Sequence, residues 1–69
     1  MKENTYKKIE VVGSSDQSLE EAVTNALNSA GGSLRNLSWF EVTEIRGAVN
    51  EQGSPIWQVT VKIGFVVEE

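Results

Sequence analysis

Apolar and polar residues alternate along two segments of the chain, a pattern typical of β-strands with one buried face. The first spans residues 6–12 and ends in turn-forming residues at 13–17. The second spans residues 56–67 and is the clearer one, because every second residue from Trp57 to Val67 is apolar. Pro55 cannot donate to a β-ladder, so it fits the first position of this strand.

The segment between them, residues 34–50, predicts one long strand or a bent pair of strands. One face of it would carry Leu37, Trp39, Ile45 and Val49, and the other Phe40, Val42, Glu44, Arg46 and Ala48. Gly47 is expected to mark a bulge or a close approach of another backbone. A turn at residues 51–54 follows, so this segment and the last strand should form a long antiparallel hairpin.

Residues 19–30 carry apolar side chains at helical spacing, in one narrow stripe that is rich in alanine. Ser18 and Glu21 predict a capping box at the helix start. Gly31 and Gly32 should end the helix, one of them in the left-handed conformation. Because the stripe consists mostly of small residues, the helix can lie close to the sheet, on the face that Trp57 belongs to.

The predicted element order is therefore β-α-β-β, in a single α+β domain that spans residues 1–69. The first strand should pair with the hairpin to give a three-stranded antiparallel sheet. One helix covers only one face of such a sheet. Apolar surface, including either Trp39 or Phe40, should remain on the other face, which predicts self-association.

Composition excludes several classes of function. The chain has no cysteine and no histidine, which excludes disulfides, thiolate or imidazole metal sites and a histidine base. Its net charge is −4 and its six basic residues are scattered, which argues against nucleic acid as a partner. No apolar run could span a bilayer and no signal core follows Met1, so we expect a cytoplasmic protein without a membrane partner. No convincing catalytic set is present, so we do not expect an enzyme.

Trp39 and Gln58 are the candidate ligand-binding residues. Trp39 and Phe40 point to opposite faces of their strand and cannot both lie under the helix. A tryptophan on the uncovered face is either an interface anchor or a stacking platform for a planar ligand, and the pattern alone favours an interface or core role. Gln58 is either an ordinary solvated strand residue or an amide that offers a donor and an acceptor to the edge of a heterocycle.

The expected hairpin register separates these two residues. It places Gln58 opposite Gly47 and Trp39 opposite Val66, with Trp39, Gly47 and Gln58 all on the face away from the helix. Trp39 and Gly47 are eight residues apart, roughly 26 Å at about 3.3 Å per residue. One ring that touches both Trp39 and Gln58 should therefore lie between two subunits.

Residues 6–15, 18–22, 37–47 and 57–65 resemble the dodecin family, most specifically the Trp-Phe-Glu-Val and Glu-Ile-Arg-Gly stretches between Trp39 and Gly47. The matching segments follow in the same order and cover nearly the whole chain. It implies a β-α-β-β subunit whose sheet wraps around the helix. It also implies a hollow homododecamer of cubic symmetry that binds flavin, with two flavins stacked between a pair of tryptophans at each two-fold axis.

The same resemblance implies roles for particular residues. Trp39 matches the stacking tryptophan and Gln58 the glutamine at the isoalloxazine edge. Glu44 falls where some relatives have an acidic residue near the ribityl chain, and Arg46 matches an arginine directed at the ligand's phosphate. Val66 stands where several bacterial relatives carry an arginine, which weakens the preference for FMN over riboflavin. Some relatives also bind coenzyme A, which makes it a second candidate ligand.

The function predicted on these grounds is flavin storage or buffering, by stacking on Trp39 with Gln58 at the ring edge. The alternative is a structural oligomerisation module without a cofactor, in which Trp39 is a buried interface anchor.

Overall fold

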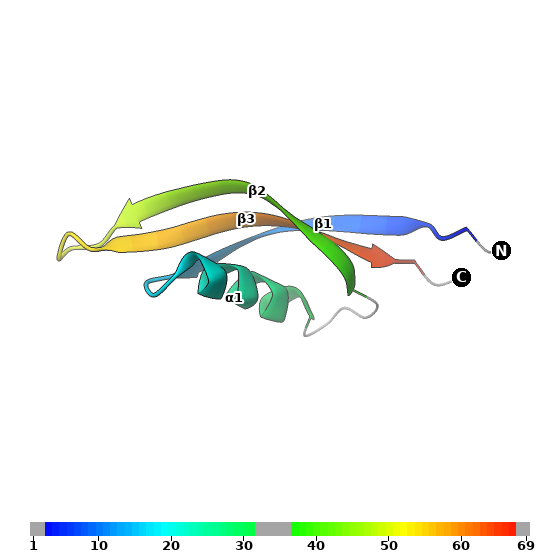
Figure 1. Cartoon of the computed structure of the whole chain (residues 1–69), viewed down its shortest axis with the longest axis horizontal. Helices are drawn as coiled ribbons and strands as arrows, with labels where there is room; N and C mark the ends of the chain where they lie inside the picture. The colour runs from blue at the N-terminus through cyan, green and yellow to red at the C-terminus, as the bar shows by residue number, and fades with distance from the viewer. Residues whose placement is uncertain (1–2, 32–36, 68–69) are drawn as a thin grey trace.

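The computed structural model of the chain describes residues 3–31 and 37–67. It contains strand β1 (Tyr6–Ser15), helix α1 (Leu19–Gly31), strand β2 (Leu37–Val49) and strand β3 (Pro55–Val66). The strands form one antiparallel sheet in the order β1-β3-β2, and α1 lies along one side of it (Figure 1). The predicted α+β class and β-α-β-β order are confirmed. Over the described ranges, no helix is both long and apolar enough to cross a membrane.

Several predicted element ends differ from the structure, most of them by one residue, and the end of β1 differs by three. Strand β1 continues to Ser15 rather than ending at Val12, because Gly13 and the two serines pair with β3. Here the cross-strand hydrogen bonds outweigh the local turn propensity of these residues. Gly31 is the last residue of α1. Gly32 and residues 34–36, which were part of the predicted helix stop and middle strand, lie outside the described residues.

The hairpin turn between β2 and β3 forms where the sequence predicted it. Gly53 has a φ of 82°, a left-handed conformation that glycine adopts without a steric penalty. The side-chain oxygen of Asn50 accepts the backbone N–H groups of Gln52 and Ser54, at 2.9 Å and 3.0 Å. These bonds give two backbone N–H groups of the turn an acceptor. The turn places Val49 opposite Pro55, which is the first residue of β3, as predicted.

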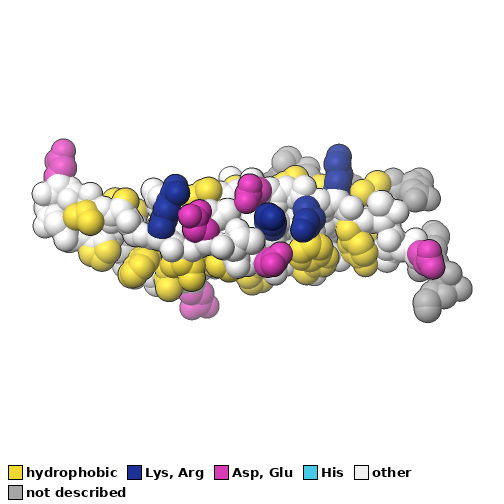
Figure 2. All heavy atoms as spheres, turned by 90° about the horizontal axis from the view of Figure 1, so that it is seen from above, with side chains coloured by type: hydrophobic (Ala, Val, Ile, Leu, Met, Phe, Trp, Pro, Cys, Tyr) yellow, Lys and Arg dark blue, Asp and Glu magenta, His cyan; other side chains and the backbone are white. Residues whose placement is uncertain are grey.

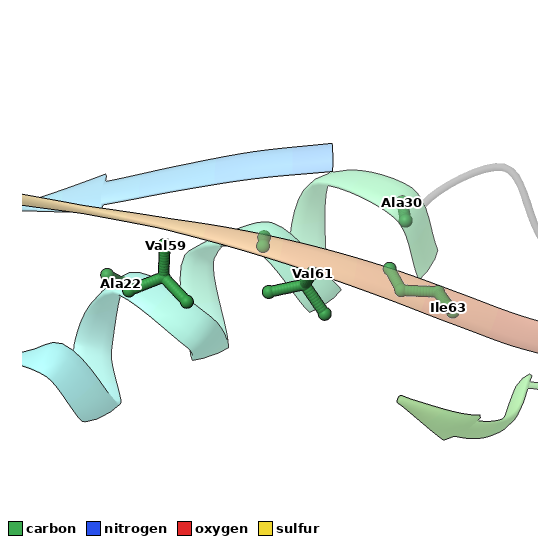
Figure 3. Close-up of a cluster of buried hydrophobic side chains, with 6 residues drawn as sticks. Ala22, Ala30, Val59, Val61 and Ile63 are labelled. Atoms are coloured by element: carbon green, nitrogen blue, oxygen red, sulfur yellow. The ribbon is translucent and has the colours of Figure 1, made fainter. Parts of the chain in front are cut away.

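The hydrophobic core lies between α1 and the sheet (Figure 3). It consists of three alanines from the helix and three β-branched residues from the central strand: Ala22, Ala26, Ala30, Val59, Val61 and Ile63. Gly13 of β1 completes the contact, because a Cβ atom at this position would lie 2.8 Å from the Cβ of Ala26. The alanines and Gly13 together allow the helix to lie close to the strands. The predicted position of the helix on the Val59 face is confirmed.

The start of α1 is joined to the end of β1 by side-chain hydrogen bonds. The N–H of Glu21 donates to the hydroxyl of Ser18 at 3.0 Å, which confirms that half of the predicted capping box. The Glu21 carboxylate instead accepts a hydrogen bond from the Ser15 hydroxyl at 2.6 Å. The Ser15 oxygen in turn accepts the N–H of Ser18 at 3.3 Å. These bonds connect the last residue of β1 with the first turn of α1.

Strand β2 keeps a row of apolar side chains uncovered on the helix side of the sheet. We call this row the β2 apolar edge: Leu37, Phe40, Val42, Ile45 and Val49. Each of them pairs with a residue of β3 that points to the helix side, and directly opposed residues share a face. All five are exposed, because α1 packs against β1 and β3. The prediction that the leftover apolar surface lies mainly on the face away from the helix is therefore wrong.

Candidate functional site

A bulge in β2 determines which of its side chains point away from the helix. Val42 pairs with Val61 and Glu44 pairs with Thr60, so Thr43 is an extra residue in β2. An extra residue in one strand reverses the alternation of its side chains beyond that point. Trp39 and Glu41, just before this bulge, therefore share a face with the even-numbered residues after it. A second register shift, between Leu37 and Trp39, leaves Leu37 on the opposite face from Trp39.

The side of the sheet away from α1, which we call the open face, receives side chains from all three strands. They are Lys8, Glu10, Val12 and Ser14 of β1, Trp39, Glu41, Glu44 and Arg46 of β2, and Gln58, Thr60, Lys62 and Gly64 of β3. Figure 2 looks onto this side of the molecule and shows acidic and basic side chains interspersed along its middle. All four site residues named from the sequence lie on the open face.

The sequence pattern had placed Glu44 and Arg46 on the face opposite to Trp39, and the bulge shows that this was wrong. Gly47 was expected on the face away from the helix, but it pairs with Trp57 and belongs to the helix side. Gly47 marks no bulge, because the pairing with β3 runs through it without a shift, and no close approach, because a Cβ atom on it would meet nothing nearer than 3.9 Å.

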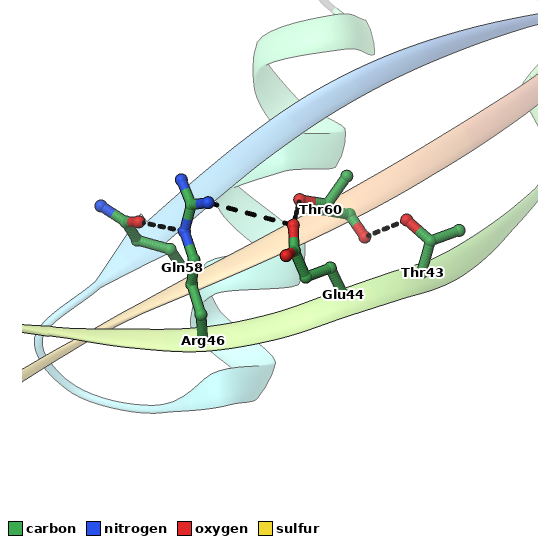
Figure 4. A network of polar contacts seen from close by, with 5 residues as sticks. All are labelled: Thr43, Glu44, Arg46, Gln58 and Thr60. Atoms are coloured by element: carbon green, nitrogen blue, oxygen red, sulfur yellow. Dashed lines mark hydrogen bonds and ion pairs between the residues drawn. The ribbon is translucent and has the colours of Figure 1, made fainter.

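Three of the four site residues are joined in one polar network (Figure 4). The Nε–H of Arg46 donates to the side-chain oxygen of Gln58 at 2.7 Å. An Nη of Arg46 lies 4.0 Å from a carboxylate oxygen of Glu44, and the same oxygen accepts the hydroxyl of Thr60 at 3.2 Å. The hydroxyl of Thr43, the bulge residue, donates to the backbone oxygen of Thr60 at 3.4 Å.

This network orients the amide of Gln58. Arginine has only hydrogen-bond donors, so the amide must turn its oxygen toward Arg46 and its NH2 group away. The NH2 group is thereby available as a donor to a ligand. The ion pair between Arg46 and Glu44 joins two exposed side chains and contributes little to stability. The contribution of the network is therefore mainly to hold Gln58 in one orientation.

Trp39 lies at the other end of the open face. It pairs with Gly64, whereas Arg46 pairs with Gln58. The expected partners, Val66 for Trp39 and a glycine for Gln58, were therefore wrong by two residues and one residue. Gln58 and Gly64 are six residues apart on one strand, roughly 20 Å at about 3.3 Å per residue. The structure thus keeps Trp39 and Gln58 of one chain far apart, as the sequence-based argument had concluded.

The sequence pattern did not single out Lys8, Thr60 or Gly64 as neighbours of the candidate site residues. The ammonium group of Lys8 lies 5.8 Å from the ring centroid of Trp39, within the range of a cation–π interaction. A glycine inside a strand is a recognised signal of a close approach, and that signal was available at Gly64. Lys8 and Thr60 carried no such signal, because their neighbours depend on the strand register.

The open face offers an aromatic plane, an amide donor and the cationic groups of Lys8 and Arg46. These groups suit the recognition of a planar polar ligand. Over residues 3–31 and 37–67, no group of three or more His, Cys, Asp or Glu side chains is placed to hold a metal ion.

Comparison with known proteins agrees with this architecture over the whole sheet and helix. The family model described as Dodecin matches residues 5–68. Dodecin from Thermus thermophilus is 50% identical over 64 residues, which are 93% of each chain. The dodecin structure from Streptomyces coelicolor superposes with a TM-score of 0.90 at 45% identity, over 100% of this chain and 99% of the other. The dodecin structure from Streptomyces davaonensis gives a TM-score of 0.90 at 41% identity, over 99% and 100%. The chain belongs to the dodecin family.

Proposed function

We propose that this chain binds a flavin, FMN or riboflavin, and stores or buffers it in a hollow homododecamer. Family membership supports this function, and the placement of Trp39 is the observation that carries it. Trp39 is 40% exposed on the open face of the sheet, outside the core that α1 covers. An aromatic side chain in that position can stack on a planar ring.

The polar network supports edge recognition by Gln58. The edge of the isoalloxazine ring carries carbonyl oxygens and ring nitrogens that accept hydrogen bonds. The NH2 group of Gln58, directed away from Arg46, is the matching donor. Arg46 retains donors for a phosphate group, and the Glu44 carboxylate is an acceptor suited to the hydroxyl groups of a ribityl chain.

The distances within one chain support a binding site shared between subunits. Trp39 and Gln58 lie roughly 20 Å apart along the sheet, farther than the isoalloxazine ring extends. A flavin in contact with both residue types would therefore take them from two chains. The exposed β2 apolar edge supplies surface for such an association. In this arrangement the pocket exists only in the assembly.

The proposal is tested by titrating FMN and riboflavin into the protein and following the quenching of flavin fluorescence. Stacking of a base on an aromatic side chain contributes about 1–3 kcal/mol, so Trp39→Ala should weaken binding about 5- to 150-fold. Trp57→Phe is the matched control, because Trp57 points to the helix side and should leave the dissociation constant unchanged. Mass spectrometry of ligands released on denaturation distinguishes FMN, riboflavin and coenzyme A.

Size-exclusion chromatography and native mass spectrometry, run on the same samples, test the assembly. A twelve-subunit species that persists in Trp39→Ala supports a stacking role. Loss of the assembly in Trp39→Ala would instead favour the structural oligomerisation module, with Trp39 as an interface anchor. Equal quenching by the wild type and by Trp39→Ala would refute the stacking role, and a well-folded monomer at micromolar concentration would refute the shared pocket.

A further inference from the structure

Trp39 belongs to a row of three residues that crosses the open face of the sheet. Lys8 on β1 and Trp39 on β2 both pair with Gly64, which lies between them on the central strand. Gly64 is buried although its row faces away from the helix and the core. Something on the open face must therefore cover it.

The indole ring of Trp39 covers Gly64. A Cβ atom built on Gly64 would lie 2.7 Å from Cδ2 of Trp39 and closer still to Cε2 and Cζ2. These three atoms belong to the six-membered part of the indole. The ring therefore lies across the bare backbone of Gly64, in space that any side chain at position 64 would occupy. Lys8 approaches from the far strand and places its ammonium group 5.8 Å from the ring centroid.

We propose that Gly64 is a positioning residue for Trp39, because its bare backbone is the surface on which the indole ring rests. The placement of the ring follows from this chain alone. Its consequence for ligand binding rests on the proposed flavin function. A ring already held in place loses less conformational freedom when a ligand stacks on it, so the affinity depends on the surface beneath it.

Gly64→Ala tests this role directly. Real Cβ atoms essentially never lie within 3.0 Å of another heavy atom, so the indole must shift or adopt another rotamer. Gly47→Ala is the matched control, since it makes the same substitution in the neighbouring strand with nothing nearer than 3.9 Å. Both variants are made in a Trp57→Phe background, which leaves Trp39 as the sole source of tryptophan fluorescence.

The first measurement uses no ligand. Gly64→Ala should shift the emission of Trp39 to longer wavelength and increase its quenching by acrylamide, whereas Gly47→Ala should change neither. The second measurement is a riboflavin titration, in which Gly64→Ala should weaken binding about tenfold or more, within the range for losing one stacking contact. Unchanged emission and quenching in Gly64→Ala would overturn the proposal, and so would riboflavin affinity within twofold of the Gly47→Ala control.

The two readouts separate this inference from the proposed function. If the wild-type protein binds no flavin, the flavin proposal fails, while the ligand-free fluorescence still decides whether Gly64 supports the ring. If Gly64→Ala folds poorly, the double variant Gly64→Ala/Trp39→Ala decides the question by a double-mutant cycle in urea. Removing the indole should then restore most of the lost stability. A double variant as unstable as the sum of the two single changes would refute the contact.

Discussion

Replacing Gly13 with alanine should push the helix away from the sheet. Gly13 lies on β1 under the helix, opposite Val59. An added Cβ would lie 2.8 Å from the Cβ and 2.9 Å from the nitrogen of Ala26, and nearer still to the carbonyl oxygen of Ala22. Two of these three atoms are backbone atoms, so no side-chain rotation can relieve the overlap.

The size of the effect follows from these distances. Ordinary van der Waals contact begins at 3.4 Å, so the helix must move by at least 3.4 − 2.8 = 0.6 Å at Ala26 and by more at Ala22. Overpacking of this kind costs about 1–3 kcal/mol, and the upper half of that range applies because backbone must move. Replacing glycine by alanine also restricts the unfolded chain and returns about 0.4–1 kcal/mol. We expect a net loss of about 1–2.5 kcal/mol for Gly13→Ala.

Urea unfolding of the protein, followed by circular dichroism at several protein concentrations, measures this loss. Concentration must be varied because association contributes to the stability of an oligomer. With a slope of about 1 kcal/mol per molar urea for a chain of this size, the midpoint should fall by about 1–2.5 M. Gly47→Ala provides the control and should leave the midpoint unchanged or slightly raised. Equal midpoints for Gly13→Ala and Gly47→Ala would refute the close helix–sheet contact.

Three further changes test the helix start, the uncovered strand and the polar network. Ser18→Ala removes the oxygen that accepts the Glu21 N–H and should lower the free energy of unfolding in urea by about 1 kcal/mol, whereas Ser18→Asp keeps an acceptor. An equal loss of stability in both variants would contradict the capping role. Ile45→Lys adds a charge to the β2 apolar edge and should give smaller species on size-exclusion chromatography with an unchanged circular dichroism spectrum. An unchanged elution volume would count against the β2 apolar edge as an interface between subunits. Arg46→Met removes the donor that orients Gln58 and should weaken the binding of riboflavin, which has no phosphate for Arg46 to contact, about fivefold. The same change should have no further effect on riboflavin binding in a Gln58→Met background, and an equal effect in both backgrounds would disprove action through the amide.

The local pattern of the sequence was sufficient for the elements and their order. Strict alternation from Trp57 onward identified β3 and its core-facing side, because a strand has a side-chain period of two. The alanine stripe identified the helix and the side of the sheet on which it lies. Ser18 marked the helix start through a hydrogen bond that spans only three residues. Interactions of this short range can be read from neighbouring residues.

The candidate site residues could also be named from the sequence, but their arrangement could not. Trp39 and Gln58 stood out in the sequence pattern, and the resemblance to the dodecin family added Arg46 and Glu44. The sequence could not show that the last three form one network, because that depends on the bulge at Thr43. A bulge is stabilised by the partner strand as well as by the residues within it, so local propensity does not locate it.

The surroundings of Trp39 show most clearly what only the tertiary structure decided. The sequence placed this residue opposite Val66, whereas the folded sheet pairs it with Gly64 and brings Lys8 within 5.8 Å of its ring. These neighbours lie 25 and 31 positions away along the chain (64 − 39 and 39 − 8). Their contact depends on the registers of two strand pairs at once. The strand types follow from the amino-acid pattern, but a register is set by the summed fit of turns, bulges and core packing over the whole sheet.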